Sequence, residues 1–279
     1  MVAISPILKR ALDRRPKPLA DTVLKIGHRG AAGEAPENTL ASFDLALRQG
    51  ADGIEFDVQL SSDLIPVIIH DARLARTTSG SGWVWEHRAS VLRRLDAGSW
   101  FNRRHRLRAR ERYAGARIPL LGEVLAWTRA RGCWAFIEVK DYRPGAVAKV
   151  MEVIERAGDW QRIQIVSFDL ATLRQVRERA AKVSLGLDFS GRLLPVRKAL
   201  GLKAQTLLPY WPIASRGLIR RAHRAGLQVI PWTVNNPLHM RRKILDGVDG
   251  LITNHPARLT EAIKWLESKG KLPRARIKL

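Results

Sequence analysis

The chain has 279 residues, of which 46% are hydrophobic and 27% are charged, a composition that excludes a disordered, collagen-like or low-complexity protein. Its 49 Lys and Arg residues outnumber its 26 Asp and Glu residues and give a formal net charge of +23 with neutral histidines. The single cysteine, Cys133, excludes an intrachain disulfide and a cysteine-based zinc site. This length allows either two domains or one α/β barrel of about 250 residues.

The N-terminus predicts no export signal. It has no charged region ahead of its apolar residues, and Pro6 and Lys9 interrupt the apolar stretch. No apolar run approaches the roughly 20 residues of a transmembrane helix. Together with the lone cysteine, these features predict a cytoplasmic protein.

Short β-branched, apolar segments alternate along the chain with longer segments of helical periodicity, which predicts a parallel sheet with crossover helices. The predicted strands are Val23–Gly27, Gly53–Val58, Val67–Ile69, Trp134–Val139, Ile163–Ser167, Ser184–Leu187, Gln205–Leu208, Gln228–Thr233 and Gly250–Thr253. The predicted helices are Thr39–Gln49, Leu121–Arg131, Ala146–Ala157, Leu170–Arg179, Ala214–Ala225, Pro237–Leu245 and Ala257–Ser268. Asn38, Asp169 and Asn236 are the predicted N-caps of three of these helices.

One of the nine predicted strands does not fit a parallel barrel. A parallel neighbour requires a crossover of a dozen or more residues, but only eight residues separate Val58 from Val67. We therefore expect Val67–Ile69 to pair back on the preceding strand, which leaves eight strands for a closed barrel. The alternative, an open doubly wound sheet, lacks a Gly-x-Gly-x-x-Gly motif after the first strand.

We predict a single α/β domain over residues 1–279, a (β/α)₈ TIM barrel with a small insertion after the second strand. The barrel core covers about 22–268, the insertion about 71–117, and a basic tail residues 269–279. The insertion is rich in Arg, Gly and Trp and shows no clear strand, so we expect it to lie over the barrel mouth.

Positive charge is concentrated in two segments. Arg93 to Arg117 holds nine arginines and two acids, and Lys269 to Leu279 holds five basic residues and no acid. Either this is a soluble basic surface, or it attracts a polyanion such as nucleic acid or an anionic membrane. No zinc-finger, RRM or basic-zipper pattern is present, so we expect no specific nucleic-acid partner and retain peripheral contact with an anionic membrane.

Acidic residues gather where the barrel strands end. Glu55 and Asp57 point the same way because side chains alternate along a strand, and Glu138 lies near the end of the fourth predicted strand. Three carboxylates that meet in a cavity repel one another, and a hard divalent cation with oxygen ligands relieves this repulsion. The pattern therefore predicts a Mg²⁺ or Ca²⁺ site. The alternative is a buried ion-pair network in which Arg29 and Lys140 neutralise the acids.

Two histidines lie at the same strand ends. His28 follows the first strand and His70 ends the short return segment, and both are suited to general acid and general base roles. Arg29 and Lys140 supply positive charge for phosphate oxygens. A cation, two histidines and two bases together predict phosphoryl chemistry. The remaining histidines are interpreted as surface or structural residues: His87, His105, His223, His239 and His255.

An ordered set of motifs over about residues 24–260 resembles the glycerophosphodiester phosphodiesterase family. The first motifs are His28-Arg29-Gly30, Pro36-Glu37-Asn38-Thr39, the segment from Gly50 to Val58 and the segment from Pro66 to Asp71. Later motifs agree in order: Arg76-Thr77-Thr78, Leu95 to Phe101, Ile118 to Leu125, Ile137 to Lys140, Ser167-Phe168, Trp232 to Asn235 and Gly247 to Thr253.

The resemblance implies a (β/α)₈ barrel that hydrolyses a small-molecule glycerophosphodiester to sn-glycerol 3-phosphate and an alcohol with a divalent metal. Carried over position by position, it makes Glu55, Asp57 and Glu138 the metal ligands. His28 and His70 become the acid/base pair, and Arg29 and Lys140 contact the substrate phosphate. Glu37 falls in a turn that supports the site, while Trp232 and Phe168 are candidates for the wall of the alcohol pocket.

Two segments depart from the family pattern. Ser61-Ser62-Asp63-Leu64 replaces the usual Thr-Lys-Asp-Gly, which removes a turn glycine and predicts a differently shaped loop. Asn254 follows Ile252-Thr253 where the family commonly has Asp, which removes a carboxylate near the barrel mouth. No predicted catalytic position is substituted.

Two other functions fit parts of the sequence. In the first, the arginine-rich insertion with Trp83, Trp85, Trp100 and Phe101 holds a lipid headgroup, giving a lysophospholipase D-like activity. In the second, the chain is a polyanion-binding protein on a barrel scaffold, although the acids and histidines at the strand ends oppose this. Within the leading hypothesis, either histidine can be the base, and either water or the glycerol hydroxyl of the substrate can be the nucleophile.

Overall fold

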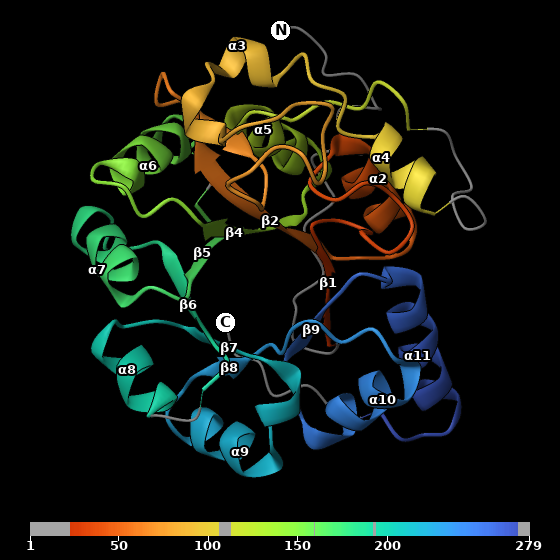
Figure 1. Cartoon of the computed structure of the whole chain (residues 1–279). Helices are drawn as coiled ribbons and strands as arrows, with labels where there is room; N and C mark the ends of the chain where they lie inside the picture. The colour runs from red at the N-terminus through yellow and green to blue at the C-terminus, as the bar shows by residue number, and fades with distance from the viewer. Residues whose placement is uncertain (1–22, 106–112, 159, 192–193, 273–279) are drawn as a thin grey trace, which may run out of the picture.

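The computed structural model describes residues 23–105, 113–158, 160–191 and 194–272. Its parallel strands form a ring with helices on the outside (Figure 1), so the predicted barrel fold is confirmed. The order around the ring is β8-β7-β6-β5-β4-β2-β1-β9. The strands are β1 Leu24–His28, β2 Gly53–Leu60, β3 Pro66–Ile68, β4 Trp134–Val139, β5 Ile163–Ser167, β6 Ser184–Phe189, β7 Thr206–Pro209, β8 Gln228–Val229 and β9 Gly250–Thr253.

The short strand β3 pairs antiparallel with β2, as the spacing predicts. The ring closes between β8 and β9 through backbone hydrogen bonds from Asp249 N to Val229 O at 3.0 Å and from Ile252 N to Pro231 O at 3.0 Å. The regular strand β8 covers only Gln228–Val229, so the predicted strand Gln228–Thr233 is too long. Pro231 has no N–H group to donate, so the regular ladder ends at Val229.

The helices cover the outside of the ring (Figure 1). They are α2 Leu40–Arg48, α5 Leu121–Arg131, α6 Ala146–Ala157, α7 Leu170–Arg179, α8 Pro195–Gly201, α9 Arg216–Arg224, α10 Pro237–Asp246 and α11 Pro256–Ser268. The sequence reading missed α8, which spans only about two turns. Three short helices follow β3: η2 Val84–Glu86, α3 Ala89–Leu92 and α4 Ser99–Arg104.

The predicted N-caps Asp169 and Asn236 are confirmed, because their side chains accept from the first turns of α7 and α10. The prediction for Asn38 is wrong. Thr39 caps α2 by accepting from Ser42 N, and Asn38 instead turns its side chain toward the barrel mouth. Threonine is one of the preferred N-cap residues, so Asn38 is released for another contact.

The buried side chains form separate hydrophobic clusters. Within the described residues, all eight residues of β2 are buried, as expected of a parallel strand covered on both faces. Seven buried side chains fill the barrel interior: Leu24, Ile26, Phe136, Val166, Leu208, Ile230 and Ile252. A second cluster lies under the segment after β2 and contains Val67, Ile69, Leu74, Val84, Ala89, Leu92, Ala97 and Ile118. The segment around His70 therefore packs on a core that is distinct from the barrel interior.

The turn between β2 and β3 carries the first departure from the family pattern. Leu64 N donates to Ser61 O at 3.1 Å, and Leu64 has a φ of 60°. This left-handed conformation costs a residue with a Cβ about 1–2 kcal/mol, whereas glycine adopts it freely. Leucine at this position therefore lowers the stability of the turn.

No helix in the described ranges is both long and apolar enough to span a bilayer. The N-terminal segment considered as a signal peptide, residues 106–112 of the arginine-rich stretch and residues 273–279 of the basic tail lie outside the described residues. The domain boundaries and the placement of the insertion over the mouth stay predictions.

Candidate active site

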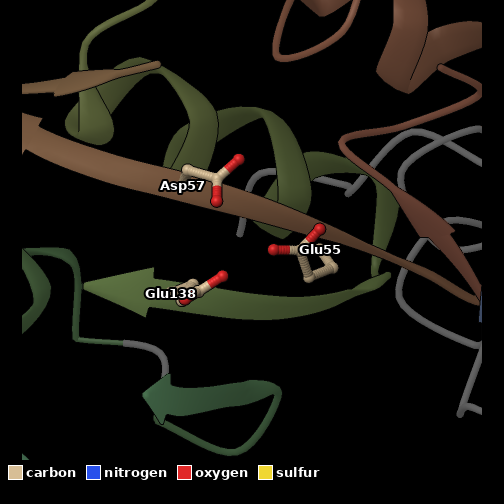
Figure 2. A group of neighbouring side chains, drawn as sticks. All are labelled: Glu55, Asp57 and Glu138. Atoms are coloured by element: carbon tan, nitrogen blue, oxygen red, sulfur yellow. The ribbon is translucent and has the colours of Figure 1, made fainter. Parts of the chain in front are cut away.

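The three predicted metal ligands meet at the carboxyl ends of two neighbouring strands. Asp57 on β2 is paired in register with Glu138 on β4, and Glu55 lies two residues before Asp57 on the same face (Figure 2). One carboxylate oxygen of each lies within 4.8 Å of the others, and all three residues are buried. The strand alternation and parallel register therefore produce the predicted cluster.

Burial and mutual repulsion disfavour the charged forms of two of these acids. Burial, followed by the charge of Asp57, raises the pKa of Glu138 to about 7. Burial and the charges of Asp57 and Glu138 also raise the pKa of Glu55 well above its usual range. Although burial raises the pKa of Asp57 too, Arg29 and other cations outweigh it and lower this pKa. A site of this kind gains stability from additional positive charge.

The oxygen atoms of the cluster fit a divalent cation. Asp57 Oδ1 is buried and accepts no hydrogen bond within the described residues. Lys140 Nζ lies 2.7 Å from Glu138 Oε1 and 3.7 Å from Asp57 Oδ1. The side chains of Arg29 and Lys140 carry two positive charges against three carboxylates, so the ion-pair alternative leaves the cluster incompletely neutralised. Carboxylate oxygens are the donors that Mg²⁺ and Ca²⁺ prefer.

Arg29 connects the carboxylates to the turn after β1. Its backbone N donates to Glu55 Oε2 at 3.1 Å, and its guanidinium Nε lies 3.1 Å from Asp57 Oδ2. Its Nη1 donates to Glu37 Oε1 at 2.8 Å. The next residue, Gly30, has a φ of 83°, and a Cβ there would lie 2.4 Å from Ser42 Oγ. Only glycine allows this turn, which places both the backbone and the side chain of Arg29 against the site.

His28 lies at the end of β1 beside the same cluster. Its Nδ1 is 2.6 Å from Asn254 Oδ1, and its Nε2 is 3.9 Å from Glu55 Oε2. Burial, followed by the charge of Arg29, lowers the pKa of His28 to about 4. The imidazole is therefore neutral near pH 7. Because an amide oxygen only accepts, the contact with Asn254 assigns the hydrogen to Nδ1 and leaves the Nε2 lone pair free to accept a proton.

His70 reaches the site from the segment after β3. Its Nδ1 is 2.6 Å from Asp71 Oδ1, and its charge contributes to lowering the pKa of Asp57. Arg76 Nε donates to Asp71 Oδ2 at 2.5 Å, and Arg76 also donates to both carboxylate oxygens of Glu37, at 2.7 and 2.8 Å. Since Glu37 also binds Arg29, a chain of ion pairs runs from His70 to Arg29. Glu37 thus has the supporting position that the sequence predicts.

The sequence reading missed three polar residues of this site. Asn38 Nδ2 donates to Asp57 Oδ2 at 2.8 Å, and the preference of asparagine for helix caps concealed this contact. Arg76 belongs to the motif Arg76-Thr77-Thr78, for which the sequence predicts no role. Asp188, near the end of β6, is buried, and burial with the charges of Glu138 and Glu55 raises its pKa well above the usual range. The strand-end rule that found Glu55 applies equally to Asp188 and would have found it.

Aromatic residues lie beside the carboxylates. Lys140 Nζ is 5.6 Å from the ring centre of Phe168, which meets Trp232 edge to face at 5.4 Å.

The four aromatic residues that the sequence suggests for binding a lipid headgroup differ in their exposure to solvent. Phe101 is fully buried and Trp100 Nε1 donates to Ala97 O at 2.9 Å, so both belong to the packing of the fold. Trp85 remains exposed.

Comparison with known proteins identifies the relatives of this chain. Residues 28–258 match the model of the glycerophosphoryl diester phosphodiesterase family. A glycerophosphodiester phosphodiesterase from Caldanaerobacter subterraneus is 36% identical over 245 residues, which cover 86% of this chain and 98% of that protein. An Oleispira antarctica phosphodiesterase in complex with the product sn-glycerol-3-phosphate superposes with a TM-score of 0.79 at 28% identity, covering 86% of this chain and 96% of that one. An Agrobacterium tumefaciens glycerophosphodiester phosphodiesterase gives a TM-score of 0.74 at 29% identity, covering 86% and 100%.

Proposed function

Because the chain belongs to the glycerophosphoryl diester phosphodiesterase family, we propose that it hydrolyses glycerophosphodiesters to sn-glycerol 3-phosphate and an alcohol with a divalent cation, Mg²⁺ or Ca²⁺. The observation that carries this proposal is the buried cluster of Glu55, Asp57 and Glu138 beside His28. The product bound in the Oleispira antarctica structure is the product expected here. A polyanion-binding protein would have no use for buried carboxylates at the barrel mouth.

Glu55, Asp57 and Glu138 are the residues that would hold the metal ion. When bound, a divalent cation supplies Lewis acidity that polarises a phosphoryl oxygen. Asn38 orients one of the ligands, because its hydrogen bond to Oδ2 of Asp57 leaves Oδ1 facing the cluster. Such contacts behind a metal ligand fix its orientation and sharpen metal affinity.

Two cationic side chains bind the phosphate and stabilise the charge that develops on it. Lys140 Nζ lies among the carboxylates, 2.7 Å from Glu138, and the Arg29 guanidinium lies against Asp57. The contact with Glu37 fixes one edge of the guanidinium. Because these cations are held in place before substrate arrives, little reorganisation is needed when the charge forms.

We assign the general base to His28 and the general acid to His70. Asn254 holds His28 with a free Nε2 lone pair beside the carboxylates, which suits removal of a proton from the nucleophile. Asp71 is the counter-ion of His70, which suits a proton-carrying imidazole that protonates the departing alcohol. In this reaction the oxygen of the nucleophile, either water or the glycerol hydroxyl of the substrate, bonds to phosphorus as His28 takes its proton. The bond between phosphorus and the alcohol oxygen breaks, and the alcohol leaves with the proton from His70.

We also propose that the protein is cytoplasmic. Its one cysteine, Cys133, is a free thiol, which is typical of a reducing compartment.

The test is release of glycerol 3-phosphate from glycerophosphocholine and glycerophosphoethanolamine with Mg²⁺, Ca²⁺ or EDTA. We expect metal-dependent release, and a loss of about 10²-fold or more in the Glu138→Gln, His28→Ala and His70→Ala variants. Glu178→Gln, an exposed change on α7, is the matched control and should retain full activity. Release that persists in EDTA, or full activity in His70→Ala, would contradict the proposal.

A further inference from the structure

The turn between β2 and β3 presents large apolar side chains to solvent. Leu64 is 49% exposed, Ile65 is 38% exposed and Trp85 is 37% exposed. We call these three residues, together with Trp83, Arg73, Arg88 and Arg143, the tip surface. Single exposed apolar residues are common on proteins, but several that gather in one place point to a partner.

Hydrogen bonds join the parts of the tip surface. Ser62 N donates to His87 O at 2.8 Å, and Ala89 N donates to Asp63 Oδ1 at 2.8 Å. Arg143 Nη2 donates to Leu60 O at 2.9 Å and so brings the loop after β4 to the same place. Figure 1 shows α3 beside the end of β2, as these bonds require. The turn, η2 and the start of α3 therefore form one continuous surface.

The two tryptophans of this surface form a stack with arginines around it. The rings of Trp83 and Trp85 lie 4.5 Å apart with an interplanar angle of 19°. Arg73 Cζ lies 4.2 Å from the ring centre of Trp83, and Arg143 Cζ lies 5.7 Å from that of Trp85. Within the described residues, Arg73 has no carboxylate partner. Tryptophan and arginine together suit the headgroup level of a bilayer, where one part of the side chain is apolar and another contacts phosphate.

The backbone conformation of Leu64 gives a reason to expect a function for its exposed side chain. It holds a left-handed backbone with a φ of 60°, which glycine would adopt without strain, and half of its surface remains in water. The leucine side chain thus lowers stability and recovers little by burial. A bulky apolar residue at such a position is explained if it is buried by something outside the chain.

We propose that the tip surface docks on an anionic phospholipid bilayer, with Leu64 and Ile65 entering the interface and Arg73 and Arg88 contacting lipid phosphates. The net charge of +23 favours this partner over a neutral or cationic one. The surface adjoins the active site, since Arg73 and Arg76 lie on the segment that follows His70. Docking would therefore place the barrel mouth near the headgroups of the membrane. This proposal does not depend on the reaction proposed above.

The test is sedimentation of the full chain with vesicles of phosphatidylcholine alone or with added phosphatidylglycerol. We expect binding to the anionic vesicles at about 0.1 M salt and much weaker binding at about 0.5 M salt. Leu64→Gly should weaken binding about fivefold or more while its melting temperature stays equal or rises, because the change removes both the apolar contact and the backbone strain. Trp85→Ser should weaken binding as well.

The matched control is Trp265→Ser on α11, well away from α3 in Figure 1. Trp265 is 43% exposed and carries Arg241 at 4.4 Å, so it has the same chemistry at another place. This variant should bind vesicles like the parent chain. Equal losses in Trp265→Ser and Trp85→Ser, or unchanged binding by Leu64→Gly, would overturn the proposal. Capture of a single-stranded oligonucleotide in preference to anionic vesicles, lost in Trp85→Ser, would overturn it in favour of nucleic acid.

Discussion

The imidazole of His28 and the side-chain amide of Asn254 form a short contact, with 2.6 Å between Nδ1 and Oδ1. The contact joins the end of β1 to the residue after β9 and sets the tautomer of the histidine. The contact itself raises the pKa of His28, but burial and the charge of Arg29 outweigh it. The pKa of His28 is therefore lowered to about 4, and the imidazole is neutral near pH 7.

Asn254→Asp should therefore move the acidic limb of the pH profile. A carboxylate beside Nδ1 favours the protonated imidazole and raises the pKa of His28. As the pH is lowered, the base is then protonated and loses its activity earlier than in the parent chain. We expect the acidic limb of kcat/KM to shift upward in pH. Asn236→Asp, which keeps the N-cap of α10, is the control. An unchanged limb would remove His28 from the role of base.

Asn38 should control metal affinity through Asp57. Loss of the 2.8 Å hydrogen bond in Asn38→Ala frees the carboxylate to rotate, and metal affinity should fall about 10- to 100-fold. Asn38 has a φ of 59°, so Asn38→Gly removes the same side chain without straining the backbone. Titration calorimetry with Mg²⁺ should give equal losses for both variants, while Asn38→Gly melts higher than Asn38→Ala. Unaltered affinity in both would show that Asp57 needs no orienting partner.

The stability of the metal-free protein should depend on pH through Glu138. Its pKa is about 7 in the folded chain and 4.5 in its ordinary state, so between these values the folded state binds more protons than the unfolded state. The contribution of Glu138 to the free energy of unfolding therefore falls as pH rises from about 4.5 to about 7. In EDTA, Glu138→Gln should melt higher than the parent chain at pH 8, with the difference shrinking toward pH 5.

Mg²⁺ should reverse this comparison, because the parent chain gains binding energy that the glutamine variant cannot supply. Glu178→Gln is again the control and should follow the parent chain at every pH. A parent chain that melts higher than Glu138→Gln at pH 8 in EDTA would show that Lys140 fully neutralises the cluster.

The thiol of Cys133 should be inert in the folded protein. It is 5% exposed, and burial raises its pKa to about 11, so very little thiolate exists at pH 8. Ellman's reagent should find no rapid reaction with the native chain and one thiol after denaturation. Rapid labelling of the native chain would mean that the junction of α5 and β4 opens on the time scale of the assay.

The barrel and the carboxylate cluster were predictable because both follow from simple periodicities. Alternation along a strand puts Glu55 and Asp57 on one face, and parallel register brings Glu138 opposite Asp57. Asn38 was not predictable, since its sequence context fits a helix cap and only the folded chain shows that Thr39 takes that role. The missing turn glycine predicts a differently shaped loop around Leu64, but the exposure of this leucine depends on what packs around it.

The two histidines that we propose as the acid/base pair lie on segments that pack on different hydrophobic clusters. His28 belongs to a barrel strand, whereas His70 follows a segment whose buried side chains form their own cluster. Loosening of that smaller cluster would withdraw one histidine while the ring of strands stays intact. Heating should therefore abolish turnover several degrees before the circular dichroism of the barrel changes, and brief heat inactivation should be reversible on cooling.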